Sequence, residues 1–222
     1  MAGRIRLVAF DFDGTIVDSM GNFADLAAEI LNREHGITHA EARRMYIETS
    51  GLPFSAQLEE LFPTDRRNGR LAIEFDQRKL EHFHARPYFP DVKPGLDFLR
   101  AMGLRLAVCS NNSQDNVDTF VQAHRAATGV WFDHVLGLRS GGFVKGRPMF
   151  DWLLATERIG KDNLLLVGDS LRDAEKARSY GIRFLGRLGT FTKADFHARF
   201  PGLPVVRSFH EFRALFKSPG RA

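Results

Sequence analysis

The stretch Arg6–Ser19, "RLVAFDFDGTIVDS", runs a short apolar segment straight into two carboxylates and a glycine. The consecutive apolar residues Leu7–Phe10 predict a strand that is covered on both faces. Unpaired carboxylates are costly to bury, so acids at the end of such a strand usually meet a cation or hydrogen-bond donors. A simple turn explains Asp13 and Gly14, because Asp-Gly followed by Thr is ordinary loop and cap chemistry. A turn does not explain Asp11.

The composition is that of a globular protein. The 222 residues are long enough for one large domain, or for a domain with a smaller inserted one. Hydrophobic residues make up 44% and charged residues 26%, which argues against disorder. The net charge is +4, and basic residues are mixed with acids rather than gathered in a tail. We therefore expect no nucleic-acid partner, while a mild positive bias favours small anions.

The single cysteine and the lack of long apolar runs narrow the protein class further. Cys109 cannot form an intrachain disulfide, and its apolar neighbours predict a small buried core residue. The N-terminal apolar run is too short for a secretory segment and ends in Asp11. No stretch approaches the ~20 apolar residues that a membrane span needs. We expect a cytoplasmic protein without membrane contact.

Short apolar runs alternate with helical patterns along most of the chain. After the first strand, the apolar runs lie at 104–110, 134–137, 163–169, 182–186 and 203–206. Helical patterns lie at about 113–127, 148–159, 171–180, 192–199 and 208–217. This alternation predicts an α/β fold with right-handed βαβ units on a parallel sheet. Ligands bind at the carboxyl ends of the strands in such sheets, and there stand Asp11, Ser110 and Asp169.

A block of residues from 17 to 87 breaks this alternation. Four helical patterns lie there with no convincing strand between them, at Phe23–His35, Ala40–Thr49, Ala56–Leu61 and Arg66–His84. The return segment "RPYFPDVKPG", 86–95, carries three prolines and a glycine, which suits a semi-rigid linker. We therefore predict a core formed by residues 1–16 and 88–222 and an inserted helical domain at 17–87.

Polar residues at the strand ends form a candidate site. Asp11 and Asp13 are two residues apart, so their side chains lean the same way on an extended backbone. Their spacing suits either a divalent cation or a nucleophile beside an acid/base group. Ser110 and Asn111, in "CSNNS", can donate hydrogen bonds to phosphate oxygens.

The later part of the chain adds two acids and a lysine to this candidate site. Asp169 and Asp173 are four residues apart, which places both on one helix face near the positive end of the helix. Lys145, in the glycine-rich "SGGFVKGRPMF", adds a movable positive charge.

In four motifs the chain resembles the haloacid dehalogenase-like superfamily of phosphohydrolases: "DFDGTIVDS", "CSNNS", Lys145 and "GDSLRDAEKA". The segments "FPDVKPGLDFLRAMGLRLAVCSNNS" and "GRLGTFTKADF" are similar to its phosphoglycolate phosphatase-like branch. The resemblance implies a Rossmann-like three-layer core with an inserted small α-helical cap domain. One departure is Gly146, because that branch commonly has proline directly after the lysine.

The resemblance also implies an activity. It makes Asp11 the nucleophile and Asp13 the general acid/base of a Mg²⁺-dependent phosphatase that cleaves small phosphate monoesters, such as phosphoglycolate, through an aspartyl-phosphate intermediate. The implied Mg²⁺ ligands are Asp11, Asp13 through its main-chain carbonyl, and Asp169, with Asp173 in support. The implied phosphate-binding residues are Ser110, Asn111 and Lys145. The expected partner is a small phosphorylated metabolite, and the expected assembly is a monomer or a homodimer.

Two other functions remain open from the sequence. A receiver-type phosphoacceptor signalling domain also gathers acids, a hydroxyl and a lysine at strand ends, but it has about half this length and no helical insert. A sugar phosphomutase of the same superfamily keeps both aspartates. A dehalogenase is less suitable, because that chemistry has no leaving alkoxide and Asp13 would have no task.

Overall fold

The computed structural model describes residues 4–83 and 86–217. Contacts divide the chain into two units, which are Met1–Val17 with Tyr88–Ala222, and Asp18–Pro87. We call the first the sheet unit and the second the helical unit. The chain leaves and re-enters the sheet unit at adjacent points, because Val17 forms an antiparallel bridge with Tyr88 and the Phe89 amide donates to the Ile16 carbonyl at 3.0 Å.

The sheet unit is built on a six-stranded parallel sheet with the order β3-β2-β1-β4-β5-β6. Its strands are β1 (Leu7–Phe10), β2 (Arg105–Ser113), β3 (His134–Leu138), β4 (Leu164–Gly168), β5 (Arg183–Arg187) and β6 (Val205–Val206). Each overlaps one of the apolar runs, although β2 continues past its run to Ser113, so the predicted parallel α/β sheet is confirmed.

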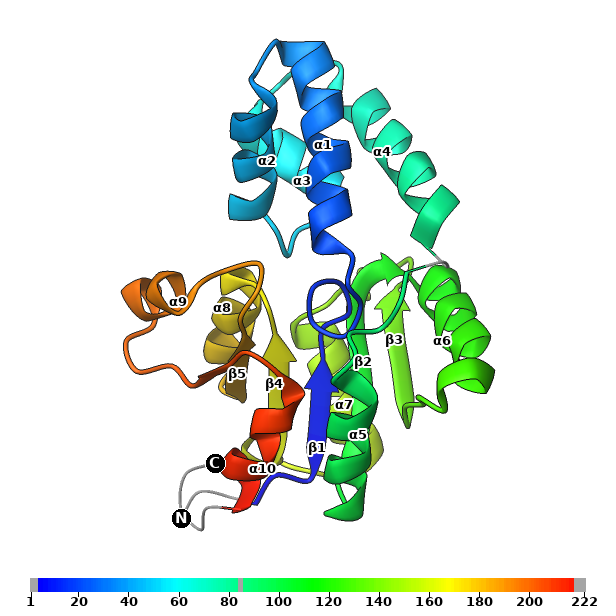
Figure 1. The fold of residues 1–222 in the computed structure, drawn as a ribbon, viewed down its shortest axis with the longest axis vertical. Coiled ribbons are helices and arrows are strands. Elements are labelled where there is room, and N and C mark those ends of the chain that lie inside the picture. Colours follow the sequence, from blue (N-terminus) through cyan, green and yellow to red (C-terminus); the bar gives the residue numbers. More distant parts are fainter. Residues whose placement is uncertain (1–3, 84–85, 218–222) are drawn as a thin grey trace. The chain divides into compact units, whose positions relative to one another are not determined.

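Helices cover both faces of this sheet (Figure 1). They are α5 (Val92–Ala101), α6 (Gln114–Thr128), α7 (Arg147–Glu157), α8 (Leu171–Tyr180), α9 (Lys193–Arg199) and α10 (Phe212–Lys217), with short 3₁₀ turns at Lys161–Asn163 and Phe209–Glu211. The chain moves outward from β1 to β2 and β3, then crosses to β4 on the other side of β1. Right-handed crossovers in these two directions place helices on opposite faces. The predicted Rossmann-like three-layer arrangement is therefore confirmed.

The core surrounds β1 and β4, which are buried along their whole length. Phe10 is fully buried, and its ring centroid lies 5.5 Å from that of Phe209 and 6.4 Å from that of Phe212. Cys109 is also fully buried, as predicted, and burial raises the pKa of its thiol to about 12. The acids that follow β1 and β4 are thus fixed to rigid strands.

The predicted linker at 86–95 is wrong at its end, because α5 already begins at Val92. Pro94 lies in the first helical turn, where an amide hydrogen has no intrahelical partner in any case. Gly95 is required by packing, since a Cβ there would lie 2.5 Å from the Cβ of Phe209. The prolines therefore mark a helix start as well as a loop.

The helical unit contains the four predicted helices. They are α1 (Met20–His35), α2 (His39–Glu48), α3 (Phe54–Leu61) and α4 (Asn68–Phe83), and His84, the last residue of the fourth predicted range, lies outside the described residues. The rings of Phe54 and Phe75 pack at 4.1 Å between centroids. Arg33 binds Glu74 across α1 and α4, with 2.7 Å between Nη2 and Oε2. Apolar faces and surface ion pairs together stabilise this bundle.

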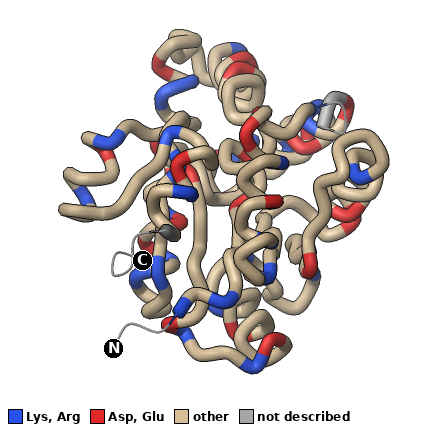
Figure 2. Tube along the Cα trace, turned by 60° about the horizontal axis from the view of Figure 1, so that its bottom comes forward, with Lys and Arg blue, Asp and Glu red and all other residues tan. Residues whose placement is uncertain are grey.

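Charged positions of both signs are interspersed along the described chain (Figure 2). Among the described residues, the helices are too short or too polar to cross a membrane. The expected absence of a nucleic-acid partner stays a prediction.

Candidate active site

Three predicted acids meet at the carboxyl edge of the sheet. Asp11 directly follows β1, Asp169 directly follows β4, and Asp173 lies in the first turn of α8. One carboxylate oxygen from each lies within 4.8 Å of the others. The residues are only 7%, 2% and 0% exposed. The parallel strands thus bring together acids that are more than 150 residues apart in the chain.

Lys145 joins two of these acids. Its Nζ lies 2.7 Å from Asp11 Oδ1 and 2.7 Å from Asp173 Oδ1. Burial alone would lower the pKa of Lys145, but the two carboxylates raise it above its ordinary value. The lysine is therefore a fixed ammonium group in this site.

The pKa shifts of the three acids reflect their burial and their closeness to one another. Burial raises the pKa of Asp11 well above its ordinary value, although Lys145 opposes this shift. Burial raises the pKa of Asp169 to about 6, and the charge of Asp173 adds to this effect. Burial also acts to raise the pKa of Asp173, but Lys145 and Lys176 hold it below its ordinary value. A cation beside these carboxylates would favour their charged forms.

Lys176 is a second amine near the site. It follows Asp173 by three residues on α8, and therefore lies on the same helix face. Burial lowers its pKa to about 8, and the charge of Lys145 contributes in the same direction.

Asp13 lies on the tight turn that follows Asp11. Gly14 adopts a φ of 73°, and its amide donates to the Val17 carbonyl at 2.9 Å. This left-handed conformation suits glycine and explains why Asp13-Gly14 follows the strand. The turn leaves Asp13 partly buried, and Asn112 Nδ2 donates to its Oδ2 at 2.7 Å.

Ser110 and Asn111 lie on the last part of β2, where the register with β3 shifts between Cys109 and Ser113. Ser110 is buried, and its Oγ accepts from the Asn112 amide at 3.0 Å. Asn111 Oδ1 accepts from the Lys145 amide at 3.1 Å. Asn111 therefore positions the backbone of the lysine, and its predicted contact to phosphate stays a prediction.

The segment that carries Lys145 differs from the pattern of the resembling branch at Gly146. This residue has a φ of 134° and precedes α7, which begins at Arg147. Proline is locked near a φ of about −65° and cannot adopt this conformation. Pro148 occupies the first turn of α7, as predicted. The loop that brings Lys145 to Asp11 thus contains a backbone conformation at position 146 that suits glycine.

Small residues allow α8 to approach β4 closely. A Cβ at Gly168 would lie 2.8 Å from Asp173 Cβ and 2.8 Å from its Oδ2. Ser170 caps the helix, because its Oγ accepts from the Asp173 amide at 3.1 Å and donates to Asp173 Oδ2 at 2.7 Å. Asp173 is therefore held by its own helix cap and by Lys145.

The sequence analysis missed three residues of the site. Asn112 was detectable, because alternation along an extended strand puts it on the same face as Ser110. Thr15 Oγ1 donates to Asp169 Oδ1 at 3.2 Å, and Thr190 Oγ1 donates to Asp169 Oδ2. The sequence around Thr15 indicates only a turn, and Thr190 carries no local signal, since the partner of both threonines is remote in sequence.

The chain is similar to known proteins in sequence and in fold. Residues 8–187 match the family described as haloacid dehalogenase-like hydrolase. A phosphoglycolate phosphatase from Vibrio vulnificus strain YJ016 is 32% identical over 199 residues, which cover 82% of this chain and 83% of that protein. One from Vibrio cholerae is 30% identical over 197 residues, covering 82% and 84%.

A solved structure shows the same fold. A haloacid dehalogenase-like family hydrolase from Streptococcus pneumoniae aligns with a TM-score of 0.75 at 19% identity, covering 96% of this chain and 99% of that one. The family match spans most of the sheet unit together with the helical unit. The chain therefore belongs to the haloacid dehalogenase-like hydrolase family, in the branch of the phosphoglycolate phosphatase-like phosphatases.

Proposed function

We propose that the protein is a Mg²⁺-dependent phosphatase that hydrolyses small phosphate monoesters, with phosphoglycolate as the first candidate substrate, through an aspartyl phosphate on Asp11. The observation that carries this proposal is the placement of Asp11. It lies beside the ammonium group of Lys145 and within a cluster of three carboxylates, with Asp13 two residues away on a turn. The names of the two Vibrio relatives support the substrate class.

The residues of the cluster fit a magnesium ion. Asp11, Asp169 and Asp173 offer hard carboxylate oxygens from a buried site, and such oxygens are the ligands that Mg²⁺ prefers. Zinc sites usually include histidine or cysteine instead. The bound ion would supply positive charge against the anionic phosphate. We propose Asp11, Asp169 and the Asp13 main-chain carbonyl as its holders, with Asp173 in support.

The side chains divide the chemistry between them. A carboxylate oxygen of Asp11 bonds to phosphorus while the bond from phosphorus to the ester oxygen breaks, and Asp13 gives the leaving oxygen its proton. Water then attacks the phosphoryl group, and Asp13 takes a proton from that water. Asp11 is released as a carboxylate, and inorganic phosphate leaves.

Lys145 has a role in both steps. Its ammonium group is already fixed 2.7 Å from Asp11 Oδ1. The positive charge is therefore in place before the phosphate binds, and the side chain does not need to be reorganised during the reaction. We propose that Ser110 and Asn111, on the last part of β2, bind the remaining phosphate oxygens.

The test is phosphate release from a panel of 2-phosphoglycolate, sugar phosphates and nucleoside monophosphates. We expect turnover with Mg²⁺, loss of turnover in excess EDTA, and recovery when Mg²⁺ is restored. Full turnover in excess EDTA would contradict the metal dependence. Transfer of phosphate between sugar positions without release would favour the phosphomutase alternative. Membership in the hydrolase family leaves the receiver alternative without support. The cytoplasmic location, the monomeric or homodimeric state and the metabolite partner stay predictions.

A further inference from the structure

Asp169 is held in a different way from the other acids of the cluster. The ammonium group of Lys145 binds Asp11 and Asp173, whereas hydroxyl groups donate to both oxygens of Asp169. One hydroxyl belongs to Thr15, on the turn after β1, and the other belongs to Thr190, on the loop after β5. The carboxylate is thus oriented from two sides by two separate loops.

The effect of a hydroxyl donor on a carboxylate differs from that of an ammonium group. Both donors orient the carboxylate oxygens and stabilise the charged form, but the hydroxyl adds no positive charge beside them. The negative charge of Asp169 therefore remains available to a cation.

The loop that carries Thr190 is fixed on both sides of this residue. On one side, Arg187 forms a buried two-pronged ion pair with Asp91, with both distances 3.0 Å, and the Leu188 amide donates to the Val206 carbonyl at 2.8 Å. On the other side, Phe191 is buried and packs against Phe196 at 6.2 Å between ring centroids. Because both flanks are anchored, the position of the threonine hydroxyl is defined before any ion binds.

We propose that Thr190 is a positioning residue for the metal site: its hydroxyl holds Asp169 in the orientation that receives Mg²⁺. This inference rests on the metal site in the proposed function. Partners that orient a metal ligand commonly contribute 10- to 100-fold to metal affinity. Thr190→Val keeps the shape of the side chain and removes the hydrogen bond.

The experiment is calorimetric titration of Mg²⁺ alone into the protein without substrate, at neutral pH. We expect Thr190→Val to weaken Mg²⁺ binding about 10- to 100-fold, and Thr190→Ser, which keeps the hydroxyl, to bind nearly as tightly as the wild type. In turnover assays, Thr190→Val should need more Mg²⁺ for half-maximal activity, while kcat at saturating Mg²⁺ should stay near that of the wild type.

Thr192→Val is the matched control. Thr192 is exposed and caps α9 by accepting from the Asp195 amide at 3.2 Å. This variant should lower the melting temperature, because it removes a helix cap, and should leave Mg²⁺ affinity unchanged. It therefore separates a general loss of stability from a loss of orientation.

Each outcome bears on a different claim. If the wild type binds Mg²⁺ and Thr190→Val binds it equally well, Thr190 is not a positioning residue. If the wild type itself binds no Mg²⁺, the metal dependence in the proposed function is wrong. If circular dichroism shows that Thr190→Val is unfolded, Thr190→Ala replaces it in the titration, and unchanged Mg²⁺ affinity in that variant contradicts the inference.

Discussion

Asn112 donates its side-chain amide to the carboxylate of Asp13, with 2.7 Å between Nδ2 and Oδ2. The two residues come from different strand ends, since Asn112 lies on β2 and Asp13 lies on the turn after β1. A donor to the charged carboxylate fixes its direction. The proposed proton transfer by Asp13 therefore depends on a residue that does not transfer a proton itself.

Asn112→Ala should impair the acid/base step. Loss of a hydrogen bond to a charged group costs about 1.5–3 kcal/mol, which corresponds to about 10- to 100-fold in rate. The loss of kcat should be larger for an alkyl phosphate than for an aryl phosphate, because the aryl leaving group needs little protonation. Steady-state kinetics on both substrates measures this. An equal loss on both would show that Asn112 does not act through Asp13.

The two aspartates should differ when each is replaced by asparagine. Asp11→Asn keeps the shape but removes the nucleophile, so turnover of every phosphate ester should disappear. Asp13→Asn keeps the nucleophile and removes proton transfer, which contributes ~10²–10⁴-fold. Its loss should be smallest on aryl phosphates, and mass spectrometry should detect phosphorylated Asp11. Near-native turnover by Asp11→Asn would refute the mechanism.

Gly168→Ala should disturb the site although it replaces no charged residue. The added Cβ would lie 2.8 Å from atoms of Asp173, so that α8 must shift. We expect a loss of about 1–3 kcal/mol in the free energy of unfolding and weaker activity, because Asp173 moves away from Lys145. Urea denaturation and phosphate release measure the two effects.

Gly160→Ala is the control for this substitution. A Cβ there meets its nearest neighbour, Asn163 Oδ1, at 3.7 Å, which is an ordinary contact. Its unfolding free energy should stay within about 0.5 kcal/mol of the wild type. Wild-type stability and activity in Gly168→Ala would show that α8 adjusts without cost.

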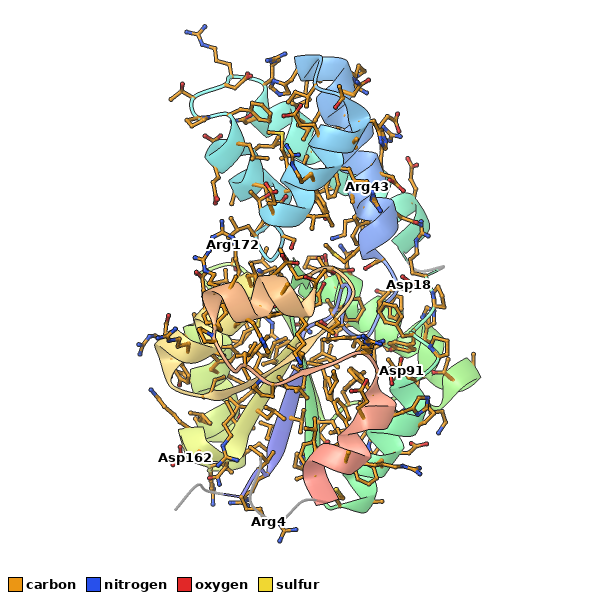
Figure 3. The ribbon with its side chains drawn as sticks, turned by 60° about the vertical axis from the view of Figure 1, so that its left-hand side comes forward. Arg4, Asp18, Arg43, Asp91, Asp162 and Arg172 are labelled. Atoms are coloured by element: carbon orange, nitrogen blue, oxygen red, sulfur yellow. The ribbon has the colours of Figure 1, made fainter. Side chains whose placement is uncertain are left out.

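The buried pair of Asp91 and Arg187 predicts a pH-dependent stability. Asp91 precedes α5 (Figure 3) and also accepts from the Phe209 amide at 2.6 Å. Burial acts to raise the pKa of Asp91, but Arg187 and the amide hold it below its ordinary value of 3.8. A carboxylate whose pKa is lower in the folded than in the unfolded protein stabilises the fold fully at pH values above its unfolded pKa. This stabilisation is lost as the pH falls through the pKa of the folded protein.

Asp91→Asn should therefore lower the free energy of unfolding by about 3–5 kcal/mol at pH 7. The difference in unfolding free energy between this variant and the wild type should shrink below pH 3.8. Urea denaturation across pH gives this profile. Asp97→Asn is the control on the same helix, because Asp97 forms an exposed pair with Lys93 that is worth about 0–1 kcal/mol. If the difference in unfolding free energy between Asp91→Asn and the wild type stayed constant down to acid pH, Asp91 would be excluded as the titrating group.

The sequence reveals the parts of the fold that have local patterns. Apolar runs predicted the six strands found among the described residues, because a strand that is buried in a parallel sheet is apolar along its length. The helical patterns predicted most of the described helices. The start of α5 was missed because proline and glycine in "VKPG" read as a linker, although both are compatible with the first turn and with close packing on Phe209.

The candidate site was predictable where its residues share a motif. Asp11 and Asp13 lie together in sequence, and Asp169 and Asp173 lie one helical turn apart, so their spacing predicts a shared site. Their individual roles are implied only by the resemblance to the haloacid dehalogenase-like superfamily. The interaction of Thr190 with Asp169 spans 21 residues and depends on how the loop after β5 is anchored. Such a contact arises from the packing of separate elements, and no local pattern encodes it.

The adjacent positions of Val17 and Tyr88 have an evolutionary consequence. The inserted segment Asp18–Pro87 begins and ends at two points that the sheet unit already holds side by side. A segment with fixed, neighbouring ends can change its length at little entropic cost, because loop closure depends only weakly on loop length. Natural selection can therefore lengthen, shorten or exchange this insert while every strand keeps its register. Proteins that share the acids at these strand ends can therefore differ in the insert between Val17 and Tyr88.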